Sequence, residues 1–184
     1  MPGEANIVSS GKPISVDAIT PEAFAPFGWM LGKPFPVTES AVAYGTACNG
    51  FWHEHIFDPG MGGEHEVLWV TYNVSDRTVD RLELHRLTQQ AVVPLVGSII
   101  QVVALSDAAG KPDLATVKAF MLSPGVGICM QPNIWHATRT TGSDATCLML
   151  TRRSTTADLV DHLTRDAPAT ETRLLDIDRL RLSR

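Results

Sequence analysis

The feature that most constrains the fold is a succession of short apolar segments that begins at Phe51 and runs to Arg153. Turn signals separate the segments, as in DPGMGG, VSDR, DAAGKPD, SPG and TTGSD. Many short strands at this spacing are typical of a β-sandwich or a small β-barrel. We therefore predict an all-β architecture with strands over GFWHEHIF, EVLWVTYNV, DRLELHRL, QAVVPLVG, SIIQVVALS, TVKAFML, GVGICMQP and TCLMLTR.

The chain length and the absence of any internal repeat favour a single domain. A chain of 184 residues can bury a sizeable core, and hydrophobic residues make up 44% of it. We predict one domain over residues 1–184. Residues 1–13 are polar and contain Gly and Pro, so they are expected to form a loose N-terminus, and residues 154–184 are expected to form a C-terminal helix and tail.

Two short helices are expected, one near each end of the chain. Thr20 is a suitable N-cap for a helix that starts at Pro21 and ends at Gly28. Thr156 could cap the second helix, whose apolar stripe would be Leu159, Val160 and Leu163. The final segment, TRLLDIDRLRLSR, alternates apolar and charged residues, and it could pack as an edge strand or against a second subunit.

Composition and charge exclude several classes of partner. The formal net charge is −5 and no Lys/Arg cluster is present, which argues against nucleic acid or an anionic membrane as a partner. No apolar run approaches eighteen residues, and the polar start MPGEANIVSS contains no signal-peptide core. Cys48, Cys129 and Cys147 form no CxxC pair, and free thiols are expected. We predict a cytoplasmic protein in a reducing compartment.

The segment LELHRLTQQAVVPLVG, residues 82–97, holds the strongest candidate for a metal site. Side chains on a strand alternate between its two faces, so Glu83 and His85 would point the same way. Gln90 follows five residues later, and His136 in QPNIWHATRT is the best fourth donor. The alternative is ordinary: surface strands often carry Glu and His on a solvated face, and pattern matches have a high false-positive risk.

These residues resemble the two sequence motifs of the cupin superfamily. Glu83 stands where the first histidine of the HxH pair usually lies, His85 is the second, Gln90 replaces the usual glutamate, and Gly97 closes the motif. The second motif would be GVGICMQPNIWH, which ends on His136. The resemblance implies a double-stranded β-helix, a jelly-roll-like barrel, with the four polar residues as metal ligands.

More specifically, the chain resembles the ureidoglycolate lyase family. The residues that carry this resemblance are ITPEAFAPFG, LELHRLTQQAVVPLVG, GKPDLATVKAF, and PGVGI followed by NIWH, in order from Ile19 to His136. The resemblance implies cleavage of ureidoglycolate, a small anionic hydroxy acid of purine and allantoin catabolism, into glyoxylate and urea. It also implies a homodimer and a nickel ion.

Ligand chemistry alone leaves the metal open. Imidazole and carboxylate ligands suit nickel, zinc, manganese or iron. One carboxylate against a dipositive ion leaves a formal charge of about +1, which favours an anionic substrate. Gln90 is neutral and a weaker ligand than a glutamate, so it could instead hydrogen-bond the substrate.

Four further residues are candidates for catalysis or substrate binding. His53 and His55 form a literal HxH in FWHEHIF, either on a half-exposed edge strand or lining the substrate pocket, where one could act as a general acid. Lys118 and Arg152 lie on predicted strands, where each could pair with a substrate carboxylate or be an ordinary solvated residue.

Three positions depart from the pattern of the family. Gln131, Ala137 and Thr151 stand where its members commonly carry basic, imidazole and carboxylate groups. Loss of such groups could remove a partner for proton transfer. The alternatives to a ureidoglycolate lyase are therefore a metal-dependent cupin lyase or isomerase for another small α-hydroxy acid, and a carboxylate-binding cupin without turnover.

Overall fold

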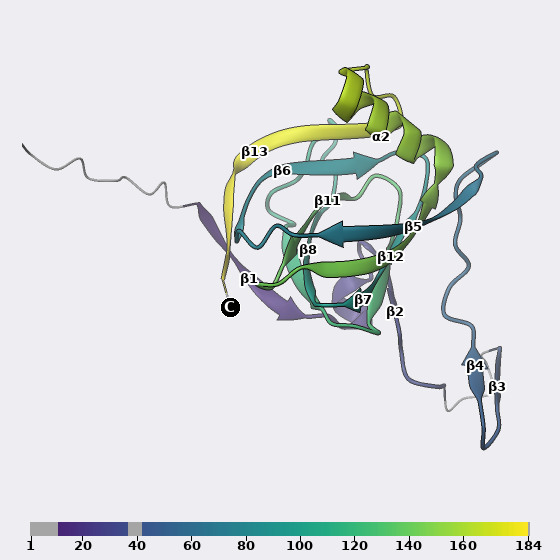
Figure 1. Cartoon of the computed structure of the whole chain (residues 1–184). Helices are drawn as coiled ribbons and strands as arrows, with labels where there is room; N and C mark the ends of the chain where they lie inside the picture. Colours follow the sequence, from purple (N-terminus) through teal and green to yellow (C-terminus); the bar gives the residue numbers. More distant parts are fainter. Residues whose placement is uncertain (1–10, 37–41, 184) are drawn as a thin grey trace, which may run out of the picture.

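Two β-sheets form the body of the protein, and a third, two-stranded sheet projects from it (Figure 1). The computed structural model describes residues 11–36 and 42–183. The elements are β1 (Lys12–Ala18), α1 (Pro21–Phe24), β2 (Gly28–Leu31), β3 (Ala43–Gly45), β4 (Gly50–Trp52), β5 (His65–Tyr72), β6 (Thr78–His85), β7 (Gln90–Val96), β8 (Ile99–Ala104), β9 (Lys118–Leu122), β10 (Gly127–Met130), β11 (Trp135–Thr140), β12 (Ala145–Arg152), α2 (Arg153–Arg165) and β13 (Thr172–Ser183).

The larger sheet closes on itself in the order β1, β13, β6, β11, β8, β9, and the second sheet has the order β2, β10, β7, β12, β5. Strand β1 closes the ring, because its first half pairs in parallel with β13 and its second half pairs in parallel with β9. The prediction of an all-β, jelly-roll-like barrel with a short helix near each end is confirmed.

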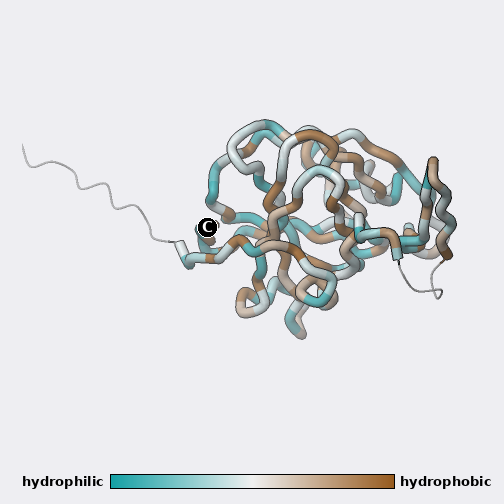
Figure 2. The backbone as a smooth tube through the Cα atoms, turned by 90° about the horizontal axis from the view of Figure 1, so that it is seen from below, coloured by the Kyte–Doolittle hydropathy of each residue, from teal (hydrophilic) through white to brown (hydrophobic). Residues whose placement is uncertain are grey.

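The body of the protein has two hydrophobic cores, and strand alternation divides the residues between them. One core is formed by residues in or next to the closed sheet, among them Leu82, Leu84 and Trp135. The other lies between the two sheets and includes Val103, Phe120 and residues from β7, β10 and β12. Figure 2 shows apolar segments, drawn in brown, along the strands of the body and also on the part that projects from it. The polar neighbours of Leu82 and Leu84 on β6 therefore face the second sheet.

The first helix starts as predicted but ends at Phe24, before Gly28, and the second differs at its start. Helix α1 begins at Pro21, and the Thr20 hydroxyl accepts a hydrogen bond of 3.2 Å from the Ala23 amide. Gly28 follows with a positive φ, and a Cβ there would overlap the carbonyl oxygen of Cys129. Helix α2 begins at Arg153, three residues before the predicted cap, and no side chain caps it. Within the described residues, no helix is long and apolar enough to cross a membrane.

Several strand predictions need correction. The predicted strand GFWHEHIF ends at Trp52 in the structure, and residues 53–57 are not part of a sheet. The WHATRT segment forms β11. This strand was not predicted, because the residues before it are typical of a turn. Strand β13 is not an edge strand, because β1 and β6 pair with its two sides. Strand β1 starts inside the predicted loose terminus, of which residues 1–10 lie outside the described chain.

Candidate metal centre

Three side chains converge on one point between the two sheets. Glu83 and His85 lie on one face of β6, and His136 lies on β11 directly opposite Glu83 in the strand register. One ligand atom from each residue lies within 4.8 Å of the others. Glu83 and His85 share a face because side chains alternate along a strand. His136 joins them because it pairs with Glu83 where β11 meets β6.

The hydrogen bonds of His136 leave one ring nitrogen free for a cation. Its Nδ1 lies 3.0 Å from the carbonyl oxygen of Ile134, which can only accept, so Nδ1 carries the proton. The other nitrogen, Nε2, is buried and has no hydrogen-bond partner among the described residues, although Glu83 Oε1 lies 3.1 Å away. Two facing acceptors at this distance fit a shared cation, so the residues suit a bound metal ion.

Burial and neighbouring charges keep this centre in the protonation states that metal binding needs. Burial, and then the charge of His136, lowers the pKa of His85 to about 4, so its imidazole is neutral near pH 7. Burial alone would raise the pKa of Glu83, but close contact with His136 and the charge of His85 bring it below its ordinary value. A neutral imidazole and a carboxylate are the forms that coordinate metals.

A second residue positions His85. Its Nδ1 lies 3.3 Å from the hydroxyl of Thr172, which is buried at the start of β13. The Thr172 amide in turn donates a hydrogen bond of 2.9 Å to Asp158 on α2. Such outer partners orient metal-binding histidines and fix their tautomer. The C-terminal helix and strand therefore support the centre from behind.

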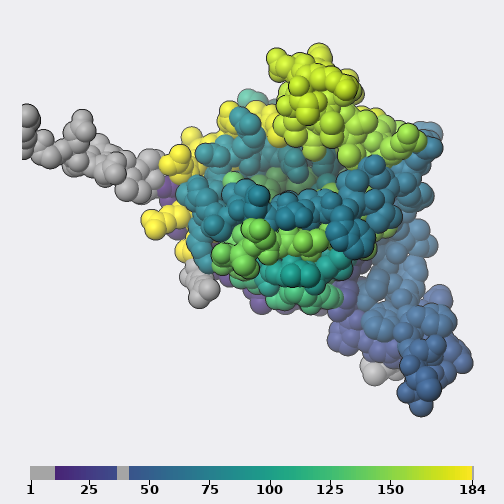
Figure 3. Space-filling view, viewed as in Figure 1, coloured from purple at the N-terminus to yellow at the C-terminus, as the bar shows by residue number. Residues whose placement is uncertain are grey.

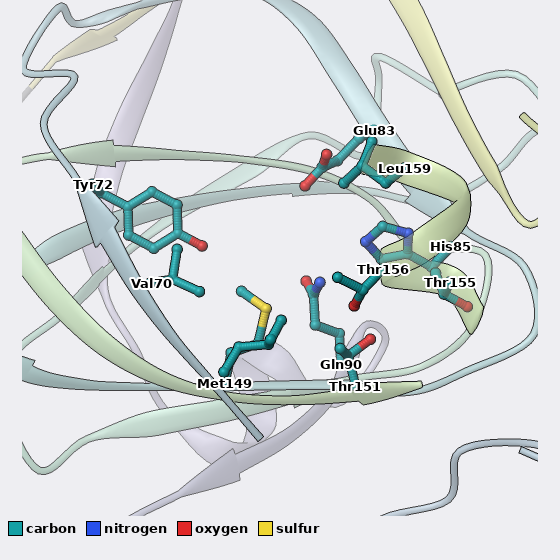
Figure 4. Close-up of a pocket in the computed structure, with 11 residues that line it drawn as sticks. Val70, Tyr72, Glu83, His85, Gln90, Met149, Thr151, Thr155, Thr156 and Leu159 are labelled. Carbon is teal, nitrogen blue, oxygen red and sulfur yellow. The ribbon is translucent and has the colours of Figure 1, made fainter. Parts of the chain in front are cut away.

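The centre opens into a cavity of about 230 Å³ (Figure 4). Its polar residues Glu83, His85 and Gln90 gather on one side with Leu159 beside Glu83, and Val70 and Met149 lie nearer Tyr72. The full set of lining residues is Leu68, Val70, Tyr72, Glu83, His85, Gln90, Met149, Thr151, Thr155, Thr156 and Leu159. Glu83 is the one formally charged residue of this set, so the metal-free cavity disfavours an anion.

A second cavity of about 320 Å³ reaches the same centre from the gap between β6 and β11. It shares Tyr72 and Glu83 with the first cavity, and His136 also lines it. Two cationic side chains, Arg81 and Arg139, stand at its walls. Glu83 therefore lies where two solvent-filled spaces meet.

The structure places His53 and His55 away from this centre. His53 is exposed, and His55 stacks on Trp29 with 4.0 Å between the ring centroids. Its Nε2 lies 2.9 Å from Gln89 Oε1. The residues around His55 include Val93 and Leu150, which alternate with cavity-facing positions on β7 and β12. His55 therefore lies on the outer face of the second sheet, and neither histidine lines the cavity.

Lys118 and Arg152 also lie outside the cavity lining. Lys118 is exposed at the start of β9. Arg152 alternates with the cavity residue Thr151, so it points the other way. Its guanidinium donates to the Ser154 hydroxyl at 2.7 Å and lies 3.6 Å from Glu171. Two carbonyl oxygens, those of Pro59 and Met61, accept further bonds from it.

Several residues that line the cavity were not predicted from the sequence. Tyr72 shares a face of β5 with Leu68 and Val70, a signal that strand alternation carries but that a single motif does not reveal. Of the three positions that depart from the family pattern, Thr151 lines the first cavity, and its buried hydroxyl has no hydrogen-bond partner among the described residues. Ala137 lines the second cavity, and Gln131 is exposed.

Comparison with solved structures finds weak similarities. The rmlC epimerase of Mycobacterium tuberculosis is 13% identical, with a TM-score of 0.43 over 68% of this chain and 62% of that chain. A dTDP sugar isomerase from Desulfovibrio desulfuricans G20 is also 13% identical, with a TM-score of 0.41 over 73% of this chain and 83% of that chain.

Comparison with curated proteins is more specific. A ureidoglycolate lyase of Chelativorans sp. (strain BNC1) is 28% identical over 139 residues, 70% of this chain and 78% of that protein. A ureidoglycolate lyase of Escherichia coli O1:K1 / APEC is 42% identical over 60 residues, which are 32% of this chain and 36% of the relative. Residues 11–170 match the family described as ureidoglycolate lyase. The chain therefore belongs to the ureidoglycolate lyase family.

Proposed function

We propose that this protein is a metal-dependent ureidoglycolate lyase that cleaves ureidoglycolate into glyoxylate and urea. The observation that carries the proposal is the cluster of Glu83, His85 and His136 beside a cavity, in a chain of this family. In the reaction the substrate hydroxyl loses a proton, the carbinol carbon becomes a carbonyl, and the C–N bond to urea breaks.

The metal would be held by Glu83, His85 and His136, with the Gln90 carboxamide as a fourth donor from the same cavity. The family resemblance implies nickel, and the same donors also suit zinc, manganese or iron. When bound, a divalent ion supplies Lewis-acid chemistry that favours loss of the hydroxyl proton. Glu83 and the two imidazoles hold three donors in place before a substrate arrives.

Neutral polar groups on the wall near His85 are suited to orienting the substrate. The Thr151 hydroxyl is buried without a partner, and Thr156 and Gln90 line the same cavity. A buried polar group without a partner costs free energy, about 1–3 kcal/mol, which a hydrogen bond to a ligand recovers. We propose that these groups bind the carboxylate or the ureido group of the small anionic substrate.

The apolar residues that line the cavity support a second candidate substrate. Leu68, Val70, Met149 and Leu159 offer no hydrogen bonds to a substrate as polar as ureidoglycolate. They would suit an α-hydroxy acid that carries an apolar substituent, in a lyase or isomerase reaction at the same centre. Rates measured with ureidoglycolate and with a series of 2-hydroxy acids of increasing side-chain size distinguish the two candidates.

The test of the proposed function is release of urea and glyoxylate from racemic ureidoglycolate. We expect turnover by the metal-loaded wild type, and background rates for the metal-free protein and for His85→Ala. His65→Ala is the matched control, because His65 is an exposed histidine on β5. Equal rates for all four proteins, at the uncatalysed background, would refute the lyase proposal.

We further propose that the protein acts as a homodimer. Support comes from the outer face of the second sheet, where Val67 and Trp69 on the edge strand β5 expose 61% and 69% of their surfaces. Leu148 and Leu150 on β12 pair with them in the register. This face is turned toward the viewer in Figure 3, with α2 above it and β3–β4 projecting below. Light scattering of wild type and Trp69→Glu tests the proposal, and a wild-type monomer would refute it.

We also propose that the protein works in the cytoplasm. The thiols of Cys48, Cys129 and Cys147 are free, as expected in a reducing compartment. Burial raises the pKa of both Cys129 and Cys147, so neither thiol is readily ionised. Fractionation of cells that express the protein with an intact N-terminus tests this location.

A further inference from the structure

Tyr72 faces the metal centre across the cavity. It lies at the end of β5, and its phenol points into the space that Glu83, His85 and Gln90 also line (Figure 4). In this view Tyr72 and His85 stand on opposite walls, with the cavity between them. A substrate held at the centre would therefore have the Tyr72 hydroxyl on its far side.

Tyr72 is also the one titratable cavity residue outside the candidate ligand set. Among the lining residues of the described chain, the titratable groups are Glu83, His85 and Tyr72, and the first two belong to the metal cluster. Neither of the general acids suggested by the sequence lines the cavity, because His55 lies on the outer face of the second sheet and His53 is exposed. The leaving urea nitrogen still needs a proton, because expulsion of an unprotonated amide anion is too costly.

We propose that the Tyr72 hydroxyl donates the proton to the leaving nitrogen of the substrate. This role rests on the proposed function. As the C–N bond breaks, its electron pair stays on nitrogen, and the phenol O–H transfers its proton there to complete urea. The electron pair of the substrate O–H bond forms the carbonyl of glyoxylate. The proton of that hydroxyl is released to solvent, and the phenolate takes one proton back from solvent, so the enzyme ends in its starting state.

The surroundings of Tyr72 suit this cycle. Burial raises the pKa of Tyr72, a hydrogen bond with Thr138 acts in the opposite direction, and the charge of Glu83 adds to the effect of burial, so the phenol is protonated near pH 7. Tyr72 also lines the second cavity, together with Thr138 and Arg139. That second space gives the phenolate a route to solvent protons that avoids the bound substrate.

The experiment compares Tyr72→Phe with a matched control. The chain has two tyrosines, and the other, Tyr44, is 55% exposed on the projecting β3–β4 sheet. For metal-loaded full-length Tyr72→Phe we expect kcat for urea release to fall by on the order of 10²–10⁴-fold, the usual contribution of general acid catalysis. Metal content, the thermal unfolding midpoint and KM should change little, and Tyr44→Phe should match the wild type.

The activities of the wild type and of Tyr72→Phe test the lyase function and the role of Tyr72 separately. Wild-type kcat in Tyr72→Phe, beside an active wild type, would overturn the role of Tyr72 and leave the lyase function intact. A wild type that releases no urea would overturn both. If Tyr72→Phe fails to fold, 3-fluorotyrosine incorporated into Tyr44→Phe changes the acidity of Tyr72 alone. A raised kcat supports proton donation, because a stronger acid transfers its proton more readily, and an unchanged kcat overturns it.

Discussion

Glu83 and His136 are direct cross-strand partners, and their facing atoms, Oε1 and Nε2, lie 3.1 Å apart at the point where β6 meets β11. The pairing links a strand from the middle of the chain to one more than fifty residues later. Because both atoms are acceptors when His136 bonds to Ile134 through Nδ1, a cation between them removes their repulsion. Metal binding should therefore also stabilise the contact between the two strands.

The first prediction concerns which residues hold the metal. Alanine at Glu83, His85 or His136 should abolish stoichiometric metal after dialysis, because each removes one of three converging donors. The double variant His53→Ala/His55→Ala should keep its metal, since His55 lies on the outer face of the second sheet and His53 is exposed. Elemental analysis of the pure proteins measures both. Metal lost from the double variant but kept by His85→Ala would place the site elsewhere.

The second prediction concerns the residue behind His85. Thr172→Val keeps the size of the side chain and removes the hydroxyl that lies 3.3 Å from His85 Nδ1. Loss of such an outer partner typically weakens metal binding about 10–100-fold. Competition with a chelator of known affinity measures the change. Thr164→Val, on the exposed side of α2, is the control and should bind metal as the wild type does. Equal affinity of the two variants would contradict a supporting role for Thr172.

The third prediction concerns the charge of the centre. Gln90→Glu adds a second carboxylate beside Glu83 and His85. With a divalent ion bound, the formal charge falls from about +1 to about 0. Metal should bind more tightly and the anionic substrate more weakly, so KM should rise. Gln90→Ala serves as the control for loss of the amide. A lower KM in Gln90→Glu than in the wild type would show that the substrate is not attracted by this charge.

The fourth prediction concerns acid sensitivity of the metal-free protein. The pKa of His85 falls from 6.5 to about 4 on folding, so the unfolded chain binds more protons between those pH values. Stability therefore decreases as the pH falls below about 6.5, and His85 accounts for about 2 kcal/mol between pH 7 and pH 5. Glu83, whose pKa is below its ordinary value, acts in the same direction at lower pH.

Urea unfolding at pH 7 and pH 5 measures this effect. His85→Gln should lose most of the dependence on pH over this range, because glutamine does not titrate. His65→Ala should retain it, since His65 is exposed. An identical dependence on pH in the wild type and His85→Gln would show that His85 is not held neutral by burial.

Local patterns were enough to predict the all-β architecture and the face shared by Glu83 and His85. Period-two alternation depends only on neighbouring residues, so it survives without knowledge of the tertiary structure. The register that brings His136 to Glu83 depends on pairing between strands that are distant in the sequence. The sequence indicated that these two residues meet only through the resemblance to the family motifs. Tyr72 and Thr151 reach the cavity through the same kind of pairing, between β5 and β12 and between β12 and β7.

The wrong strand predictions have a related cause. The segment around His55 looks like a strand, yet Trp29 and Gln89 hold it against the outer face of the second sheet through side-chain contacts. The backbone of residues 53–57 pairs with no strand of a sheet. The alternation of apolar and polar residues along a segment does not reveal whether a partner strand is present. The final segment looked like an edge strand because of its charged residues. Its place inside the closed sheet is set by pairing with β1, about 170 residues earlier in the chain.

That pairing has a consequence for biosynthesis. Lys12 aligns with Leu180, and Thr172, which contacts His85, is the first residue of β13. A nascent chain cannot close the barrel or complete the support of its metal ligands until the ribosome has released β13. Contacts of such large sequence separation also form slowly. We therefore expect ribosome-bound chains that end before β13 to bind a metal ion more weakly than the full chain, because Thr172 is missing behind His85.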